Sequence, residues 1–129
     1  MNTFLVVFIG GGLGSTLRFL LSTTIQRAAP GHFPLGTFTV NLIGCFVIGV
    51  LWALSGRMNF PFLISAFLFA GILGGFTTFS SFGIETFALI HDGAWRTAAF
   101  YMVLTNLAGL SLAAGGFAIT ELLCSRVLP

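Results

Sequence analysis

Apolar residues fill four long runs of the sequence, and short polar or turn-forming segments separate these runs. The runs cover about residues 4–24, 37–54, 60–90 and 94–123. A helix rises about 1.5 Å per residue, so about 20 apolar residues cross the hydrocarbon core of a bilayer. Each run is close to this length or longer. The pattern therefore predicts an all-α membrane protein with four transmembrane helices, in a single domain over residues 1–129.

The third run is too long for one straight crossing and contains a stretch that is suited to a break. This stretch reads Gly74-Gly75-Phe76-Thr77-Thr78-Phe79-Ser80-Ser81-Phe82. Glycine is the weakest helix former after proline, and the hydroxyls that follow can replace lost backbone hydrogen bonds. A broken membrane helix survives only where it is buried in protein or lines a wet cavity. We therefore expect the third helix to break at mid-membrane, at the Gly74-Gly75 pair, and to form a site there.

Two features of this stretch favour ion binding. Backbone carbonyls that are freed at a helix break are good neutral ligands for sodium, so the carbonyls of Gly74 and Thr77 are expected to hold Na⁺. Phe79 and Phe82 lie three residues apart and share a helix face. Because an aromatic ring has a positive edge, two rings presented edge-on favour an anion. The alternative is that both rings pack against lipid or the protein core.

Small and polar residues mark one face of each remaining span. The first span carries Gly10 and Gly14, and the second carries Asn41, Cys45 and Gly49. The fourth span carries Thr105, Asn106, Gly109, Ala113 and Gly116. Such faces predict close packing against other helices rather than contact with lipid.

Three polar side chains within the spans each have a structural and a functional interpretation. Arg18 is costly inside a membrane, so it either has a function or snorkels to the interface. Asn41 either bonds one helix to another or donates its amide to an anion in a pore. Glu85 is either a solvated or hydrogen-bonded acid near a helix end or a functional group.

Composition and charge exclude several classes of protein. Hydrophobic residues make up 57% of the chain, charged residues make up 6% and the mean hydropathy is +1.06, values that soluble domains do not reach. The chain has no basic patch for nucleic acid. It also has no nucleotide-binding loop, serine-histidine-acid set or clustered metal ligands, so we expect no enzyme. The N-terminus lacks the positive region of a signal peptide, so the first span is expected to be retained.

The third-span motif, together with Gly36-Thr37, Val40-Asn41-Leu42 and Arg18, resembles the Fluc (CrcB) family of fluoride channels. The resemblance covers nearly the whole chain in length, number of spans and order of motifs. It implies an antiparallel homodimer in the cell membrane, with two fluoride pores and a structural Na⁺ at the dimer centre. It also implies passive export of cytoplasmic fluoride. The implied partners are fluoride, sodium, a second copy of the chain and the lipid bilayer, and not nucleic acid.

The resemblance favours the functional interpretation of each ambiguous residue. It implies that Asn41 is a pore donor and that Arg18 and Glu85 belong to a vestibule. The residues expected at the fluoride pore are Thr37, Asn41, Phe79, Ser81, Phe82, Tyr101 and Thr105.

Three functions are compatible with four spans: a passive fluoride channel, a small proton-coupled multidrug exporter and a noncatalytic packing subunit. An exporter needs a membrane-embedded carboxylate to exchange protons. Spans 1, 2 and 4 offer none at mid-depth, and Glu85 lies late in span 3. A packing subunit leaves the break and its Phe-Thr-Ser cluster unexplained. The sequence therefore favours the channel.

Arginine placement predicts how the chain inserts into the membrane. Four spans put Arg57 and Arg126 on one side and Arg27 and Arg96 on the other. Because orientation follows the excess of Lys and Arg in short flanking segments, a tie predicts insertion in both orientations. Dual topology would supply both members of an antiparallel homodimer.

Overall fold

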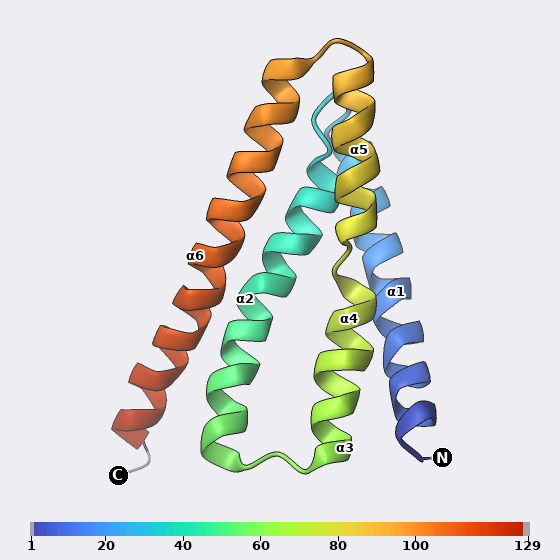
Figure 1. The fold of residues 1–129 in the computed structure, drawn as a ribbon. Helices are drawn as coiled ribbons and strands as arrows, with labels where there is room; N and C mark the ends of the chain where they lie inside the picture. Colours follow the sequence, from blue (N-terminus) through green and yellow to red (C-terminus); the bar gives the residue numbers. More distant parts are fainter. Residues whose placement is uncertain (1, 128–129) are drawn as a thin grey trace.

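The computed structural model describes residues 2–127, which form four long rods (Figure 1). The first two rods are α1 (Asn2–Ala28) and α2 (Leu35–Met58). The third rod is composite and consists of α3 (Phe62–Ser65), the π-helix η1 (Ala66–Leu73), α4 (Gly74–Phe76) and α5 (Phe79–His91). The fourth rod is α6 (Trp95–Val127). Four long apolar helices are present, as expected, and they lie near the expected stretches of the sequence. Met1, Leu128 and Pro129 of the expected domain lie outside the described residues.

Successive rods run in opposite directions. The start of α1, the end of α6 and the turn between α2 and α3 lie at one end of the bundle, and the α1–α2 loop and the α5–α6 turn lie at the other (Figure 1). The closest packing is between α2 and α6 and between α1 and the third rod. Arg57 therefore lies at the opposite end of the bundle from Arg27 and Arg96.

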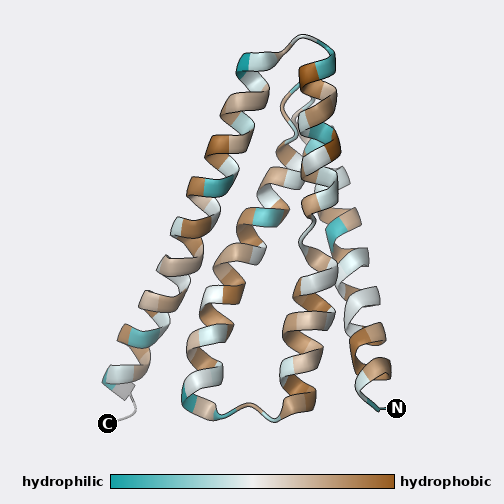
Figure 2. Cartoon of the chain, viewed as in Figure 1, coloured by the Kyte–Doolittle hydropathy of each residue, from teal (hydrophilic) through white to brown (hydrophobic). Residues whose placement is uncertain are grey.

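Large apolar side chains cover the outside of the bundle. Phe4, Phe8, Phe62 and Leu110 are among those that are exposed, and apolar residues run along every rod (Figure 2). Such a surface is unfavourable in water and matches the hydrocarbon tails of lipids. All four rods are long and apolar enough to cross a membrane. The chain is a multi-pass membrane protein.

Glycines allow the helix backbones to approach one another closely. A methyl group at Gly14 of α1 would collide with the carbonyl oxygen of Ile72, and one at Gly75 would lie 2.5 Å from the carbonyl oxygen of Gly11. Gly49 lies in the same way against the backbone of α6. The packing role predicted for the small-residue faces is therefore confirmed at Gly14 and Gly49.

Candidate functional site

The third rod is interrupted at Thr77 and Thr78. Both residues have extended backbone, with φ and ψ of −82° and 152° at Thr77 and of −146° and 113° at Thr78. The segment Gly74–Phe76 remains helical, so the expected position of the break, at the Gly74-Gly75 pair, is wrong. Gly75 serves instead to bring the third rod against α1, and the break falls where a side chain from α2 replaces the lost backbone hydrogen bonds.

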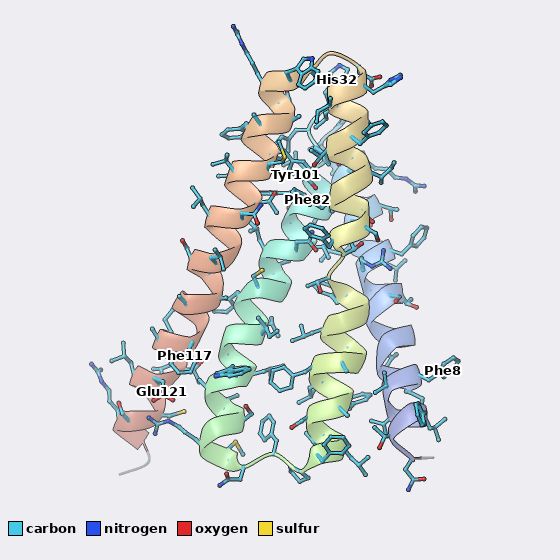
Figure 3. The ribbon with its side chains drawn as sticks, in the orientation of Figure 1. Phe8, His32, Phe82, Tyr101, Phe117 and Glu121 are labelled. Carbon is cyan, nitrogen blue, oxygen red and sulfur yellow. The ribbon has the colours of Figure 1, made fainter. Side chains whose placement is uncertain are left out.

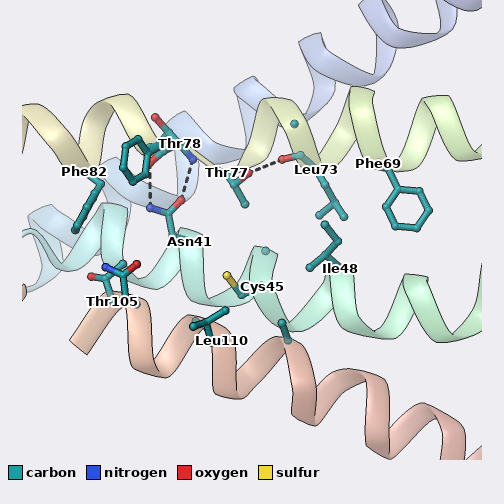
Figure 4. A pocket seen from close by; sticks show the side chains of 16 residues that line it. Asn41, Cys45, Ile48, Phe69, Leu73, Thr77, Thr78, Phe82, Thr105 and Leu110 are labelled. Carbon is teal, nitrogen blue, oxygen red and sulfur yellow. Dashed lines mark hydrogen bonds between the residues drawn. The ribbon is translucent and has the colours of Figure 1, made fainter. Parts of the chain in front are cut away.

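That side chain is Asn41. Its Oδ1 accepts a hydrogen bond from the Thr78 N–H at 2.8 Å, and its Nδ2 donates to the Thr78 carbonyl at 3.1 Å (Figure 4). The Thr78 hydroxyl in turn accepts from the Ser81 N–H at 3.2 Å and caps the first turn of α5. Asn41 thus bonds α2 to the broken segment. One Nδ2 hydrogen has no partner within residues 2–127, and its role as an anion donor stays a prediction.

The opposite side of the break is bonded to α1. The carbonyl of Gly75 would accept from the N–H four residues later in a continuous helix, but the break removes that donor. Arg18 Nε donates to this carbonyl at 3.0 Å, and the Ser15 hydroxyl lies 3.4 Å from it. Arg18 is half-buried, and its Nε is anchored next to the break by this bond.

Phe79 and Phe82 lie together, as their spacing predicts, but differ in burial. Their ring centroids are 5.5 Å apart and the ring planes are tilted by 44°. Phe79 is 81% exposed, whereas Phe82 is 8% exposed and packs against Tyr101 with a centroid separation of 5.0 Å (Figure 3). The two rings therefore extend from the exposed surface of the chain to its buried interior.

A polar cluster joins three helices next to the buried ring. The Glu85 carboxyl of α5 accepts hydrogen bonds from the Thr37 hydroxyl of α2 at 2.6 Å and from the Tyr101 hydroxyl of α6 at 2.9 Å. Thr37 and Tyr101 are both buried. Sequence reasoning selected these three residues one by one, and the structure brings them together. The hydrogen-bonded interpretation of Glu85 is confirmed, while its vestibule role stays a prediction.

A groove with a volume of about 420 Å³ lies between α2, the third rod and α6 (Figure 4). Six of the predicted site residues line this groove: Asn41, Gly74, Thr77, Phe79, Phe82 and Thr105. The Thr105 hydroxyl is buried without a hydrogen-bond partner in the part of the chain that the structure describes. The remaining predicted residues lie outside the lining. These are Arg18, Thr37, Ser81, Glu85 and Tyr101.

Several lining residues were absent from the predicted site, and two of them, Thr78 and Asn106, carry a hydroxyl or an amide. Thr78 caps α5, and its position directly before a helical segment is the signal for an N-cap. Asn106 lines the groove and belongs to the small and polar face that the sequence places on the fourth span. Thr78 meets Asn41 of α2 only because the helix is interrupted just before α5.

Comparison with known proteins gives a family to this arrangement. Residues 5–117 match the family described as CrcB-like protein, Camphor Resistance (CrcB). A fluoride-specific ion channel FluC of Parabacteroides distasonis is 44% identical over 110 residues, 85% of each chain. The FluC of Azobacteroides pseudotrichonymphae is 44% identical over 90% of this chain and 94% of its own. That of Methylobacillus flagellatus is 43% identical over 95% of this chain and 97% of its own. Because the family match covers residues 5–117 and these relatives are 43–44% identical over most of both chains, this chain belongs to the CrcB-like family.

Proposed function

We propose that this chain is a fluoride-selective ion channel that lets cytoplasmic fluoride leave the cell by passive permeation. The observation that carries the proposal is its family membership, with relatives named fluoride-specific ion channels that are 44% identical and of matching length. The protein is accordingly a channel in the cell membrane and not an enzyme. These relatives do not favour the alternative of a proton-coupled multidrug exporter.

The anion path follows the two phenylalanines and the polar cluster beside them. Fluoride holds its water tightly, so a narrow path must replace that shell with donors and positive ring edges and still release the ion. Phe79 and Phe82 supply the ring edges, and Asn41 supplies its second amide hydrogen. The Ser81 hydroxyl is hydrogen-bonded to that of Thr78 beside the break. The Thr105 hydroxyl at the groove has no hydrogen-bond partner among the described residues. Thr37 and Tyr101 continue the path in the interior, where both donate to the Glu85 carboxyl.

Arg18 attracts anions towards this path. Its Nε is bonded to the Gly75 carbonyl, and its terminal nitrogens make no hydrogen bond within residues 2–127. A guanidinium that is anchored by one nitrogen keeps its charge and leaves other donors free. Arg18 and Glu85 then form the vestibule through which fluoride enters and leaves.

The functional unit is an antiparallel homodimer that is assembled from chains of both orientations. In one protomer Phe79 is 81% exposed, and the groove beside it is a mostly apolar concavity. A second copy in the opposite orientation covers this face and brings two third-span breaks together at mid-membrane. The two ends of the bundle carry equal numbers of flanking arginines, so the chain inserts in both orientations.

A sodium ion at the dimer centre is held by the Gly74 and Thr77 carbonyls of both chains. Within residues 2–127 neither carbonyl accepts a hydrogen bond, because the Thr78 N–H turns to Asn41 and the Ser81 N–H to the Thr78 hydroxyl. Neutral carbonyl oxygens suit a hard cation, so these residues fit sodium. When bound, the ion supplies positive charge near the anion path.

Ion flux from liposomes that contain only the purified protein tests this function. The channel predicts fluoride efflux that follows the electrochemical gradient and needs no second substrate, with far slower efflux of chloride. Proton-coupled uptake of a cationic drug without fluoride efflux would establish the exporter instead. If a folded, inserted protein showed neither fluoride efflux nor drug uptake, the result would favour a packing subunit.

A further inference from the structure

The short loop between α1 and α2 is held in place by one side chain. Gln26, on the last turn of α1, accepts a hydrogen bond through Oε1 from the Gly36 N–H at 3.1 Å. Its Nε2 lies 3.5 Å from the Gly31 carbonyl and 3.4 Å from the Phe33 carbonyl, within donating distance of both. Pro34, which precedes α2, makes no side-chain cap. Gln26 therefore caps the start of α2 from the neighbouring helix and binds the loop at the same time.

The loop places an aromatic ring on the polar cluster. Phe33 packs edge-on against Tyr101, with ring centroids 5.3 Å apart, and edge-on against Phe38 at 5.5 Å. Tyr101 is 0% exposed, and Phe82 contacts it at 5.0 Å. The ring of Tyr101 is thus confined by Phe33 and by Phe82. These two contacts fix the direction of the Tyr101 hydroxyl, which donates to Glu85.

The geometry points to Gln26 and Phe33 as positioning residues for the anion path. Gln26 holds the loop, the loop holds Phe33 on Tyr101, and this contact keeps the Tyr101 hydroxyl on Glu85. Loss of either residue lets the whole Tyr101 side chain swing about its Cα–Cβ bond, which moves the hydroxyl away from Glu85 and breaks a hydrogen bond to the carboxyl. The effect on ion flux rests on the proposed function, whereas the effect on Tyr101 does not.

Tyr101 is the single tyrosine of the chain, so it can be observed alone. Protein labelled with tyrosine carrying ¹³C at the ring carbon that bears the hydroxyl gives one signal, which is sensitive to hydrogen bonding of that hydroxyl. The test variants are Phe33→Leu and Gln26→Leu. Gln26→Glu is a milder variant that keeps the acceptor for Gly36 and loses the donor to the loop. The matched control is Phe100→Leu, because Phe100 contacts Phe33 at 6.0 Å but is 58% exposed on the outer surface.

Phe33→Leu and Gln26→Leu are expected to shift the Tyr101 signal and to lower fluoride flux about tenfold, as loss of a hydrogen bond to a charged group would. Phe100→Leu is expected to leave the Tyr101 signal and the fluoride flux unchanged within experimental error. In a Tyr101→Phe background, Phe33→Leu should reduce flux no further, because the two changes remove the same interaction. A general loss of packing would instead give additive effects.

An unchanged Tyr101 signal in Phe33→Leu and in both Gln26 variants would overturn the inference, whatever the flux. Additive losses of flux in the Tyr101→Phe background would overturn it as well. A shifted signal with unchanged flux would support the positioning role and would remove the Tyr101–Glu85 contact from the ion path. Absence of fluoride flux from the unmodified protein would contradict the proposed function and leave the signal test intact.

Discussion

At the scale of single residues, the phenylalanine pair is the clearest test of the anion path. Replacing Phe82 by Ile keeps an apolar side chain but removes the ring edge beside Tyr101. Fluoride flux should fall at least about tenfold while the dimer remains folded, because an aliphatic group offers no positive edge to an anion. Flux from liposomes, normalised to reconstituted protein, measures the effect.

Phe87→Ile is the matched control, since Phe87 lies on the same helix and is exposed. It should leave flux unchanged. If both Phe79→Ile and Phe82→Ile also leave fluoride flux unchanged, the rings have no part in the mechanism.

A substitution at Asn41 tests whether this side chain stabilises the helix break, independently of any role in anion binding. Asn41→Leu leaves the Thr78 N–H and carbonyl without their side-chain partners, at a cost of about 1–3 kcal/mol for each group that stays unsatisfied. Thermal unfolding in detergent should therefore shift to clearly lower temperature. Asn106→Leu provides the comparison, because among residues 2–127 the Asn106 side chain bonds only to the Met102 carbonyl of its own helix. Equal stability of the two variants would show that Asn41 does not hold the break.

At the scale of helices, packing of α1 against the third rod depends on glycine. Gly14→Ala would drive a methyl group into the Ile72 carbonyl, and neither backbone can yield without moving a helix. We expect a loss of about 1–3 kcal/mol in stability from this overpacking. Gly12→Ala, two residues away with nothing near its Cβ position, should change stability by less than about 0.5 kcal/mol. Thermal unfolding compares them, and a tolerated Gly14→Ala would mean that the two helices are not in tight contact.

At the scale of the whole molecule, dual topology makes a prediction about labelling. A single reactive cysteine is introduced as Asp92→Cys, in the α5–α6 turn, in a variant without Cys45 and Cys124. About half the chains should react with an impermeant reagent on intact cells, because the arginine tie gives no fixed orientation. Met58→Cys, at the opposite end of the bundle, should also label about half. Nearly complete labelling at one position and nearly none at the other would mean one orientation and would exclude the antiparallel dimer.

Sodium removal tests the centre of the proposed dimer. If carbonyls of Gly74 and Thr77 hold Na⁺, exhaustive exchange for a large organic cation should lower both dimer stability and fluoride flux, because the bound ion joins two helix breaks. Dimer dissociation is measured against sodium concentration, and flux is measured in parallel. Unchanged dissociation and flux, together with only water in density at this position, would show that the site is wrong.

The sequence by itself determined the class of the molecule, the four spans and the family. These properties depend on local hydropathy, on the thickness of a bilayer and on a contiguous motif, all of which are present in the order of residues. It also indicated a break in the third span, because that run exceeds one crossing.

Only the tertiary structure decided where the break falls and which groups meet there. Thr78 leaves the helix because Asn41, 37 residues away, offers it both a donor and an acceptor. Glu85 meets Thr37 across 48 residues of sequence, and no periodicity within one helix reports such a contact. Position 75 requires glycine because the backbone of α1 occupies the space that a side chain would need. The positions of these groups follow from how the rods pack, which depends on all four of them together.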